Sequence, residues 1–140
     1  MSLRVWLPLN GTLDNQGLDD VVVTNNGATV NNSGKIGKCY SFDGNDDYIQ
    51  LTNFNMSNMS EFSISCWAKP TSSNLNNSLF LVRRDGSHQI RLSSDGFCFR
   101  DNHHSSQTVV SFGEPFLENI WTHISCVYKK GIIYLYQNGI

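Results

Sequence analysis

Alanine is nearly absent from this 140-residue chain, which contains only Ala28 and Ala68. Strong helix formers are scarce throughout, whereas Asn, Ser, Thr, Gly and the residues that favour strands dominate. The composition therefore predicts an all-β fold. A chain of this length can bury one hydrophobic core without help from disulfides or metals, so we expect a single compact domain.

Charge of either sign is also sparse, with 10 basic residues, 12 acidic residues and a formal net charge of -2. Nucleic acids and anionic membranes are recognised by clustered Lys and Arg, so neither is an expected partner. No stretch approaches the ~20 apolar residues of a membrane span. The first residues lack the basic and apolar regions of a signal peptide. The sequence as written predicts a soluble chain with no signal peptide and no membrane insertion.

Acidic residues suited to catalysis are few, because the chain has only three glutamates, Glu61, Glu114 and Glu118, all in predicted loops. A glycosidase needs two carboxylates held about 5 to 10 Å apart, and no array of this kind is visible. Motifs of serine hydrolases, zinc proteases and phosphate-binding loops are missing as well. We therefore expect that the chain is not an enzyme.

Short segments with period-2 alternation are separated by clusters of Gly, Asn, Asp and Ser, a pattern typical of a sandwich or barrel. The candidate strands span residues 3–7, 21–23, 38–42, 48–51, 62–69, 79–83, 88–92, 96–100, 108–112, 121–129 and 132–137.

The strand predicted at 62–69 has apolar even-numbered residues, which form the expected core face. Its odd-numbered residues are polar apart from Trp67, whose indole is either covered by a loop or exposed for binding. The strand predicted at 121–129 repeats the pattern, with Ile124 on the apolar face and His123 on the other. The two strands can therefore pair with matched faces.

All four cysteines, Cys39, Cys66, Cys98 and Cys126, lie in predicted strands without Cys-x-x-Cys spacing. A zinc site is therefore not expected, and the thiols are interpreted as small core hydrophobes. The alternative is a disulfide between Cys66 and Cys126, which requires neighbouring strands in register. A chain without a signal peptide normally keeps its thiols reduced.

One acidic turn gathers several hard oxygens, which calcium prefers as ligands. Its residues are Asp43, Asn45, Asp46 and Asp47. Turns of this composition also form without an ion, because Asp and Asn side chains bond their own backbone. The sequence leaves both interpretations open, a structural turn and a calcium site.

A hairpin signal closes the chain, because Asn138-Gly139 follows the strand predicted at 132–137 and suits a type I′ turn, which needs positive φ at both positions. Only Ile140 follows. We expect either a fragment of a longer product or a partner chain at the open edge, including an oligomer, since an unpaired edge is a template for aggregation.

Six segments assemble, in order, into a family pattern: VWLPLNGTLD (5–14), GKIGKCYSFDG (34–44), DYI (47–49), FSISCWAKP (62–70), WTHI (121–124) and LYQNG (135–139). Together they resemble the laminin-G-like domains of the concanavalin A-like lectin and glucanase superfamily. The resemblance runs the whole chain and implies one domain, 1–140, folded as an antiparallel β-sandwich of jelly-roll type. It also implies binding of carbohydrate or protein, with calcium at a rim loop in some members, for which the acidic turn is the candidate.

The sequence departs from the family pattern in three respects. Laminin-G-like domains continue past the Asn-Gly turn by several strands, so the resemblance implies missing C-terminal strands. Gln137 stands where the family usually has an apolar residue, and an inward polar group needs a partner. Pentraxin relatives carry a disulfide between strands resembling those of Cys66 and Cys126, but each cysteine here is displaced by one position, which moves its side chain to the opposite face.

The expected function is that of a non-catalytic binding module that recognises carbohydrate or a surface protein, as a lectin-like adhesion domain does. Stacking aromatics and polar groups that could hold such a ligand are Tyr48, Trp67, Arg83 and Asn102. The alternative is a structural or adhesion component of a larger assembly, such as a bacteriophage virion, in which partner chains complete the sandwich. Either role places the site of action outside the cell or on a virion.

Overall fold

A computed structural model describes residues 2–56, 59–71, 79–84, 88–93, 96–101, 108–112 and 117–140, and between 79 and 112 it describes the backbone of the strands. This part of the chain contains eleven strands, β1 to β11, and every strand pairing in it is antiparallel. The all-β prediction is confirmed. The described residues include no helix that could span a bilayer.

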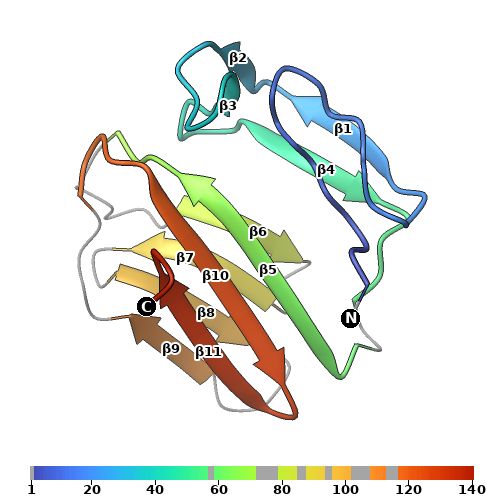
Figure 1. Cartoon of the computed structure of the whole chain (residues 1–140), viewed down its shortest axis with the longest axis vertical. Coiled ribbons are helices and arrows are strands. Elements are labelled where there is room, and N and C mark those ends of the chain that lie inside the picture. Colours follow the sequence, from blue (N-terminus) through green and yellow to red (C-terminus); the bar gives the residue numbers. More distant parts are fainter. Residues whose placement is uncertain are drawn as a thin grey trace. The chain divides into compact units, whose positions relative to one another are not determined.

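The chain divides into two compact units, Met1–Met59 and Ser60–Ile140. The first unit holds two two-stranded sheets, which pair β1 (Val22–Asn26) with β4 (Tyr48–Thr52) and β2 (Thr29–Asn31) with β3 (Cys39–Ser41). The second unit holds the other seven strands (Figure 1). That residues 1–140 act as a single domain stays a prediction.

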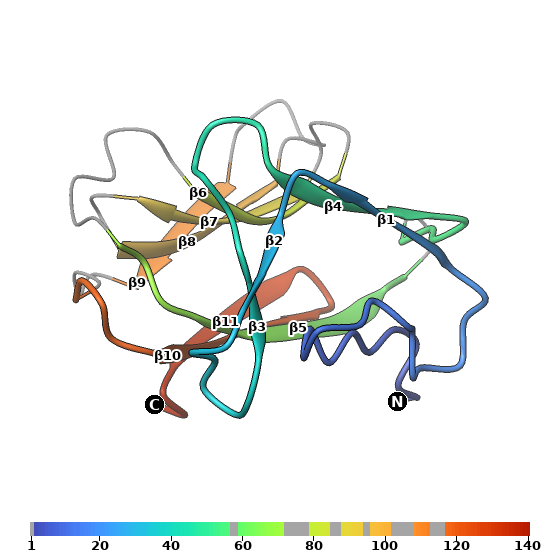
Figure 2. The same cartoon turned by 90° about the horizontal axis from the view of Figure 1, so that it is seen from above.

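The second unit consists of two sheets. One has the order β11-β10-β5, from Ile132–Gln137, Thr122–Lys129 and Glu61–Ala68. The other has the order β6-β7-β8-β9, from Leu79–Arg84, His88–Ser93, Gly96–Asp101 and Thr108–Phe112. Figure 2 shows these sheets as separate layers, and β11 contacts both β8 and β9.

Alternation along β5 and β10 places the core as the sequence predicts. Phe62, Ile124 and Cys126 are buried, and the rings of Phe62 and Tyr128 stack with centroids 5.2 Å apart. The strands pair so that Ile124 lies opposite Cys66, and the apolar faces of both strands therefore coincide. The prediction of two neighbouring strands with matched faces is confirmed.

The prediction of a strand at 3–7 is wrong, because this segment has no regular secondary structure. Its backbone bonds go to the loop that follows: Gln16 N donates to Trp6 O (2.8 Å), and Trp6 N donates to the Asn15 side-chain oxygen (2.8 Å). A Cβ at Gly17 would collide with the Arg4 carbonyl oxygen, so only glycine permits this close approach. Backbone N–H groups of the loop, together with the Asn15 side chain, thus take the place of a partner strand.

No strand is predicted between 24 and 37, but the structure places the end of β1 and all of β2 there. Asn25 and Asn26, which disfavour strands by propensity, pair with Ile49 and Tyr48 of β4. The other predicted strands are found with ends that differ by at most one residue, and those predicted at 108–112 and 132–137 coincide with β9 and β11.

The turn at Asn138-Gly139 has the predicted conformation, with φ of 54° and 89°. Gln137 N donates to Ile140 O (3.0 Å) and Ile140 N donates to Gln137 O (3.2 Å), which closes a two-residue turn. The Gln137 side-chain oxygen is buried and accepts no hydrogen bond within the described part of the chain. The expectation of an inward polar group in need of a partner is confirmed.

Candidate functional site

The outward face of the sheet β11-β10-β5 carries a group of aromatic and small polar side chains, which we name the aromatic face. It lies opposite the buried face of Ile124 and Cys126. Its central residues are Ser63, Ser65 and Trp67 of β5, His123, Ser125 and Val127 of β10, and Tyr134 and Tyr136 of β11. All belong to the second unit, and the pairing register fixes how they are arranged.

Trp67 and His123 form one cross-strand row of the aromatic face. They are register partners, and their ring centroids lie 5.1 Å apart with a 54° angle between the planes. Trp67 is 44% exposed, which favours the interpretation of an indole exposed for binding over that of one covered by a loop. The backbone of His123 is held by Asn138, which accepts from His123 N (3.0 Å) and donates to His123 O (2.8 Å).

The next two rows of the aromatic face end in tyrosines. Tyr136 lies opposite Ser125, and Tyr134 lies opposite Val127. Both tyrosines are exposed. Sequence reasoning missed them, although period-2 alternation along 132–137 already places them together on one side of the strand.

Charges lie at the two ends of the aromatic face. Glu61, predicted in a loop, is the first residue of β5 and lies opposite Lys129 of β10. Beyond the other end, the Lys69 ammonium stands 5.6 Å from the centroid of the Trp121 ring, a cation–π contact. The rows that contain Trp67, Tyr136 and Tyr134 carry no carboxylate and no Lys or Arg.

Cys66 and Cys126 lie on neighbouring strands but are not opposite each other, because Cys66 pairs with Ile124 and Cys126 pairs with Ile64. Both thiols are free, as is Cys39. The alternative of a disulfide between Cys66 and Cys126 is therefore wrong. Burial raises the pKa of Cys66 to about 11 and that of Cys126 to about 12. These thiols therefore stay protonated at neutral pH and pack as small hydrophobes, as interpreted. Cys98 belongs to β8, where only the backbone is described.

The acidic turn is closed by its own side chains. Asp43 Oδ1 accepts from the backbone N–H of Asn45 (2.8 Å), Asp46 (3.3 Å) and Asp47 (3.4 Å), while Asp43 N donates to Asp47 Oδ2 (2.8 Å). The hydrogen bond from the Asn45 backbone, and then that from its side chain, holds the pKa of Asp43 below its usual range. These bonds support the interpretation of a structural turn.

The same turn brings one carboxylate oxygen each from Asp43, Asp46 and Asp47 within 4.8 Å of one another. Three oxygens this close fit the hard ligand set of calcium. Asp43 already accepts several hydrogen bonds, whereas the Asp46 carboxylate accepts none from the described residues. Calcium binding therefore stays a prediction, with Asp46 as the ligand that the turn itself does not use.

The two interpretations of the acidic turn predict different effects of substitution. Asp43→Ala is expected to lower the melting temperature at neutral pH without calcium, because three backbone N–H groups lose their acceptor, whereas Asp46→Ala leaves melting unchanged. Since the pKa of Asp43 is lowered on folding, the difference is full above about pH 3.9 and is lost as the pH falls through the folded pKa. Thermal unfolding by circular dichroism measures both variants. Equal melting of Asp43→Ala and the parent would contradict the structural role.

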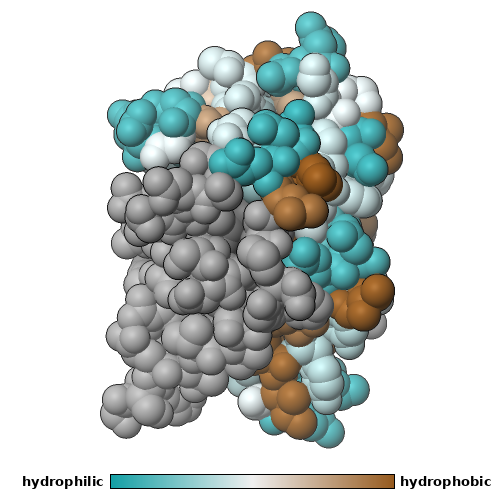
Figure 3. All heavy atoms as spheres, turned by 90° about the vertical axis from the view of Figure 1, so that its left-hand side faces the viewer, coloured by the Kyte–Doolittle hydropathy of each residue, from teal (hydrophilic) through white to brown (hydrophobic). Residues whose placement is uncertain are grey.

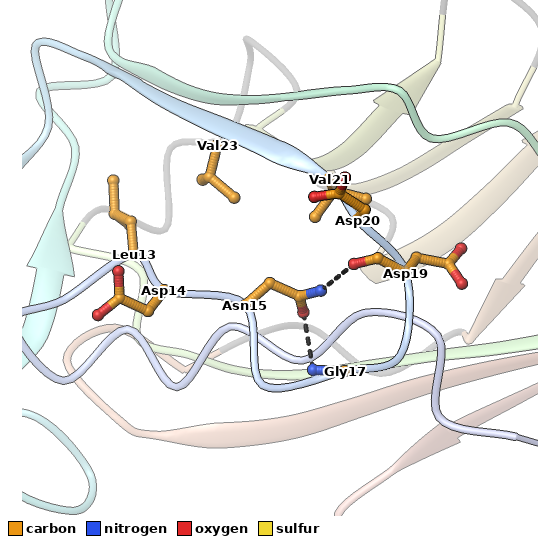
Figure 4. A pocket seen from close by; sticks show the side chains of 8 residues that line it. All are labelled: Leu13, Asp14, Asn15, Gly17, Asp19, Asp20, Val21 and Val23. Atoms are coloured by element: carbon orange, nitrogen blue, oxygen red, sulfur yellow. Dashed lines mark hydrogen bonds between the residues drawn. The ribbon is translucent and has the colours of Figure 1, made fainter.

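The first unit contains a hollow of about 410 Å³ between the loop at 13–20 and β1 (Figure 4). Three of its lining residues are aspartates, and none is aromatic. The Asn15 side chain forms hydrogen bonds within the loop, donating to Asp19 O (2.7 Å) and accepting from Gly17 N (2.9 Å). Asp19 is also bound to Arg4, at 2.6 Å. Contacts within the loop therefore explain the hollow, and we do not propose it as a binding site.

The four predicted ligand-binding residues belong to different elements of the chain. Trp67 lies on the aromatic face, whereas Tyr48 is an exposed residue of β4 in the first unit. The backbone of Arg83 belongs to β6. Asn102 lies outside the described residues. On the coloured part of the surface in Figure 3, apolar residues occur in separate spots among hydrophilic ones.

Comparison with known proteins gives a family and a fold. The laminin G family, described as "Concanavalin A-like lectin/glucanases superfamily", matches residues 43–140. Among solved structures, the chain is similar to domain 4 of AbnA, an extracellular arabinanase of glycoside hydrolase family 43 from Geobacillus stearothermophilus, in complex with arabinotriose. The TM-score is 0.74 at 20% identity, over 100% of this chain and 74% of the other. No curated protein sequence matches the chain. The chain belongs to the concanavalin A-like lectin and glucanase superfamily, and its fold is the all-β antiparallel sandwich.

Proposed function

We propose that the chain is a non-catalytic carbohydrate-binding module and that the aromatic face is its binding surface. The observation that carries this proposal is the exposed indole of Trp67, held against His123 on a sheet face lined with serine hydroxyls. Sugar rings present apolar C–H faces and polar edges. A stacked aromatic ring beside hydroxyl groups therefore complements both parts of a sugar.

Two further observations support the proposal. The similar domain 4 of the arabinanase was solved in complex with arabinotriose and comes from an extracellular enzyme, which favours a glycan ligand and a site of action outside the cell for this chain too. The rows of the aromatic face that hold Trp67 and the tyrosines contain no carboxylate, whereas hydrolysis of a glycoside needs two.

Retention on a panel of immobilised neutral and acidic polysaccharides tests the proposal. We expect the parent protein to be retained on at least one neutral glycan and to be released by the same glycan in solution. Because stacking does not depend on an ion, EDTA is expected to leave retention unchanged. A parent protein that passes every glycan without delay would contradict the proposed function.

A calcium site at the acidic turn belongs to this proposal as a separate structural feature. Its support is the spacing of the three carboxylates. A calcium-dependent rise in melting temperature that Asp46→Ala removes would establish the ion. Identical melting of the parent with calcium and with EDTA would leave the turn purely structural. The roles in adhesion or in a virion, and a partner chain or oligomer at the open edge, stay predictions.

A further inference from the structure

We propose that the aromatic face binds a neutral, extended oligosaccharide that runs diagonally across three strands, from Trp67 to Tyr134. This inference rests on the proposed function and names its ligand class. It goes further than that function by distinguishing an extended chain from a single terminal sugar and a neutral glycan from an acidic one.

The register of the sheet gives the length of this diagonal. Trp67 lies on β5, Ser125 lies one row further on β10, and Tyr134 lies one row further again on β11. Neighbouring strands are about 4.8 Å apart and alternate residues about 6.7 Å, so the backbone positions of Trp67 and Tyr134 are roughly 16 Å apart. A single sugar ring cannot contact both aromatic side chains, whereas an oligosaccharide can.

The side chains along the diagonal suit consecutive sugars. An aromatic ring stands at each end, and the Ser125 position lies between them, with Ser65 and Tyr136 as its cross-strand neighbours in the middle row. Aromatic rings provide stacking surfaces, and serine hydroxyls donate and accept hydrogen bonds without net charge. Stacking and hydrogen-bonding positions therefore alternate along the diagonal.

Charge favours a neutral ligand. Acidic polysaccharides are bound by clustered Lys and Arg, and the three central rows hold neither. Lys129 lies one row beyond Tyr134 and directly opposite Glu61, so an acidic chain would meet a carboxylate beside the cation. His123 is the histidine of these rows, and the indole of Trp67 lies against its imidazole.

The test is a length series of neutral arabino-, xylo- and gluco-oligosaccharides, from disaccharide to octasaccharide, measured by isothermal titration calorimetry. Affinity is expected to rise by about tenfold with length and then level off once the chain spans the diagonal. Tyr134→Ala is expected to remove about fivefold of the affinity for the longest chain and none for the disaccharide. Tyr134→Phe, which keeps the ring, should bind as the parent does.

Phe42→Ala is the matched control, because Phe42 is an aromatic residue of the other unit with comparable exposure, 47% against 45% for Tyr134, and we expect no change in affinity. Equal affinity at every length, or an equal loss for short and long chains in Tyr134→Ala, would overturn the extended ligand while leaving the proposed function intact. Tighter binding of polygalacturonate that weakens with salt would overturn neutrality. If no glycan binds at all, the proposed function and this inference fall together.

Discussion

Replacing Ile124 with alanine is expected to lower the free energy of unfolding by about 3 kcal/mol, because deleting a buried isoleucine loses both transfer energy and packing. Ile124 is 1% exposed, and its strand β10 lies between β5 and β11. For a chain of this size the loss corresponds to a fall in melting temperature of roughly 10 °C. Urea unfolding followed by tryptophan fluorescence measures the free energy directly.

Ile132 provides the matched control for this substitution, because Ile132→Ala deletes the same atoms from a side chain that is 54% exposed on β11. Its expected effect lies within about 0.5 kcal/mol. Equal losses in the two variants would mean that the sheet β11-β10-β5 does not bury the face that contains Ile124. The assignment of the opposite side as the aromatic face would then be wrong as well.

Replacing Trp67 with alanine is expected to weaken binding of a retained glycan by roughly thirtyfold, the loss typical of a central aromatic residue in a binding surface. Trp67→Phe keeps a smaller ring and should retain part of the affinity. Melting should change little in both variants, because the indole is exposed and its described ring contact is with His123. Calorimetric titration of the parent and both variants gives the ratio of affinities.

Trp6 is the control for Trp67, since it is a tryptophan of similar exposure, 52%, in the first unit. Trp6→Ala is expected to bind glycan as the parent does. If Trp6→Ala weakens binding as much as Trp67→Ala does, the ligand does not select the aromatic face.

The local sequence pattern predicted those parts of the fold in which paired strands share the same alternation of apolar and polar residues. In β5 and β10, alternation alone identifies Phe62 and Ile124 as core residues, and the burial agrees. The turn at Asn138-Gly139 was also predictable, since few residue pairs accept positive φ at both positions. In each case the sequence within a few residues determines the conformation.

Elements that depend on distant groups could not be predicted from pattern. Residues 3–7 alternate as a strand does, but the Asn15 side chain takes a backbone N–H that a neighbouring strand would otherwise bind. The asparagines at the end of β1 join a strand because β4 offers backbone partners, in spite of their low propensity. Such contacts join residues that come together only when the chain folds, so the local sequence does not show them.

Only part of the candidate site could be predicted from the sequence. Alternation identified Trp67 as the aromatic residue on a polar face, but it could not say whether a loop covers the ring. Tyr134 and Tyr136 share one side of their strand by sequence alone. Only the pairing of Cys126 with Leu135 shows that this side is the outward one. The aromatic face is thus a property of three strands in register.

The measurement that tests the central claim most directly is chemical-shift mapping of the ¹⁵N-labelled protein with a neutral oligosaccharide that the panel retains. We predict that the largest changes occur at the Trp67 indole N–H and at the backbone amides of His123, Ser125 and Tyr136. Changes confined to the acidic turn at 43–47 or to the hollow at 13–23, with the aromatic face unchanged, would contradict the account.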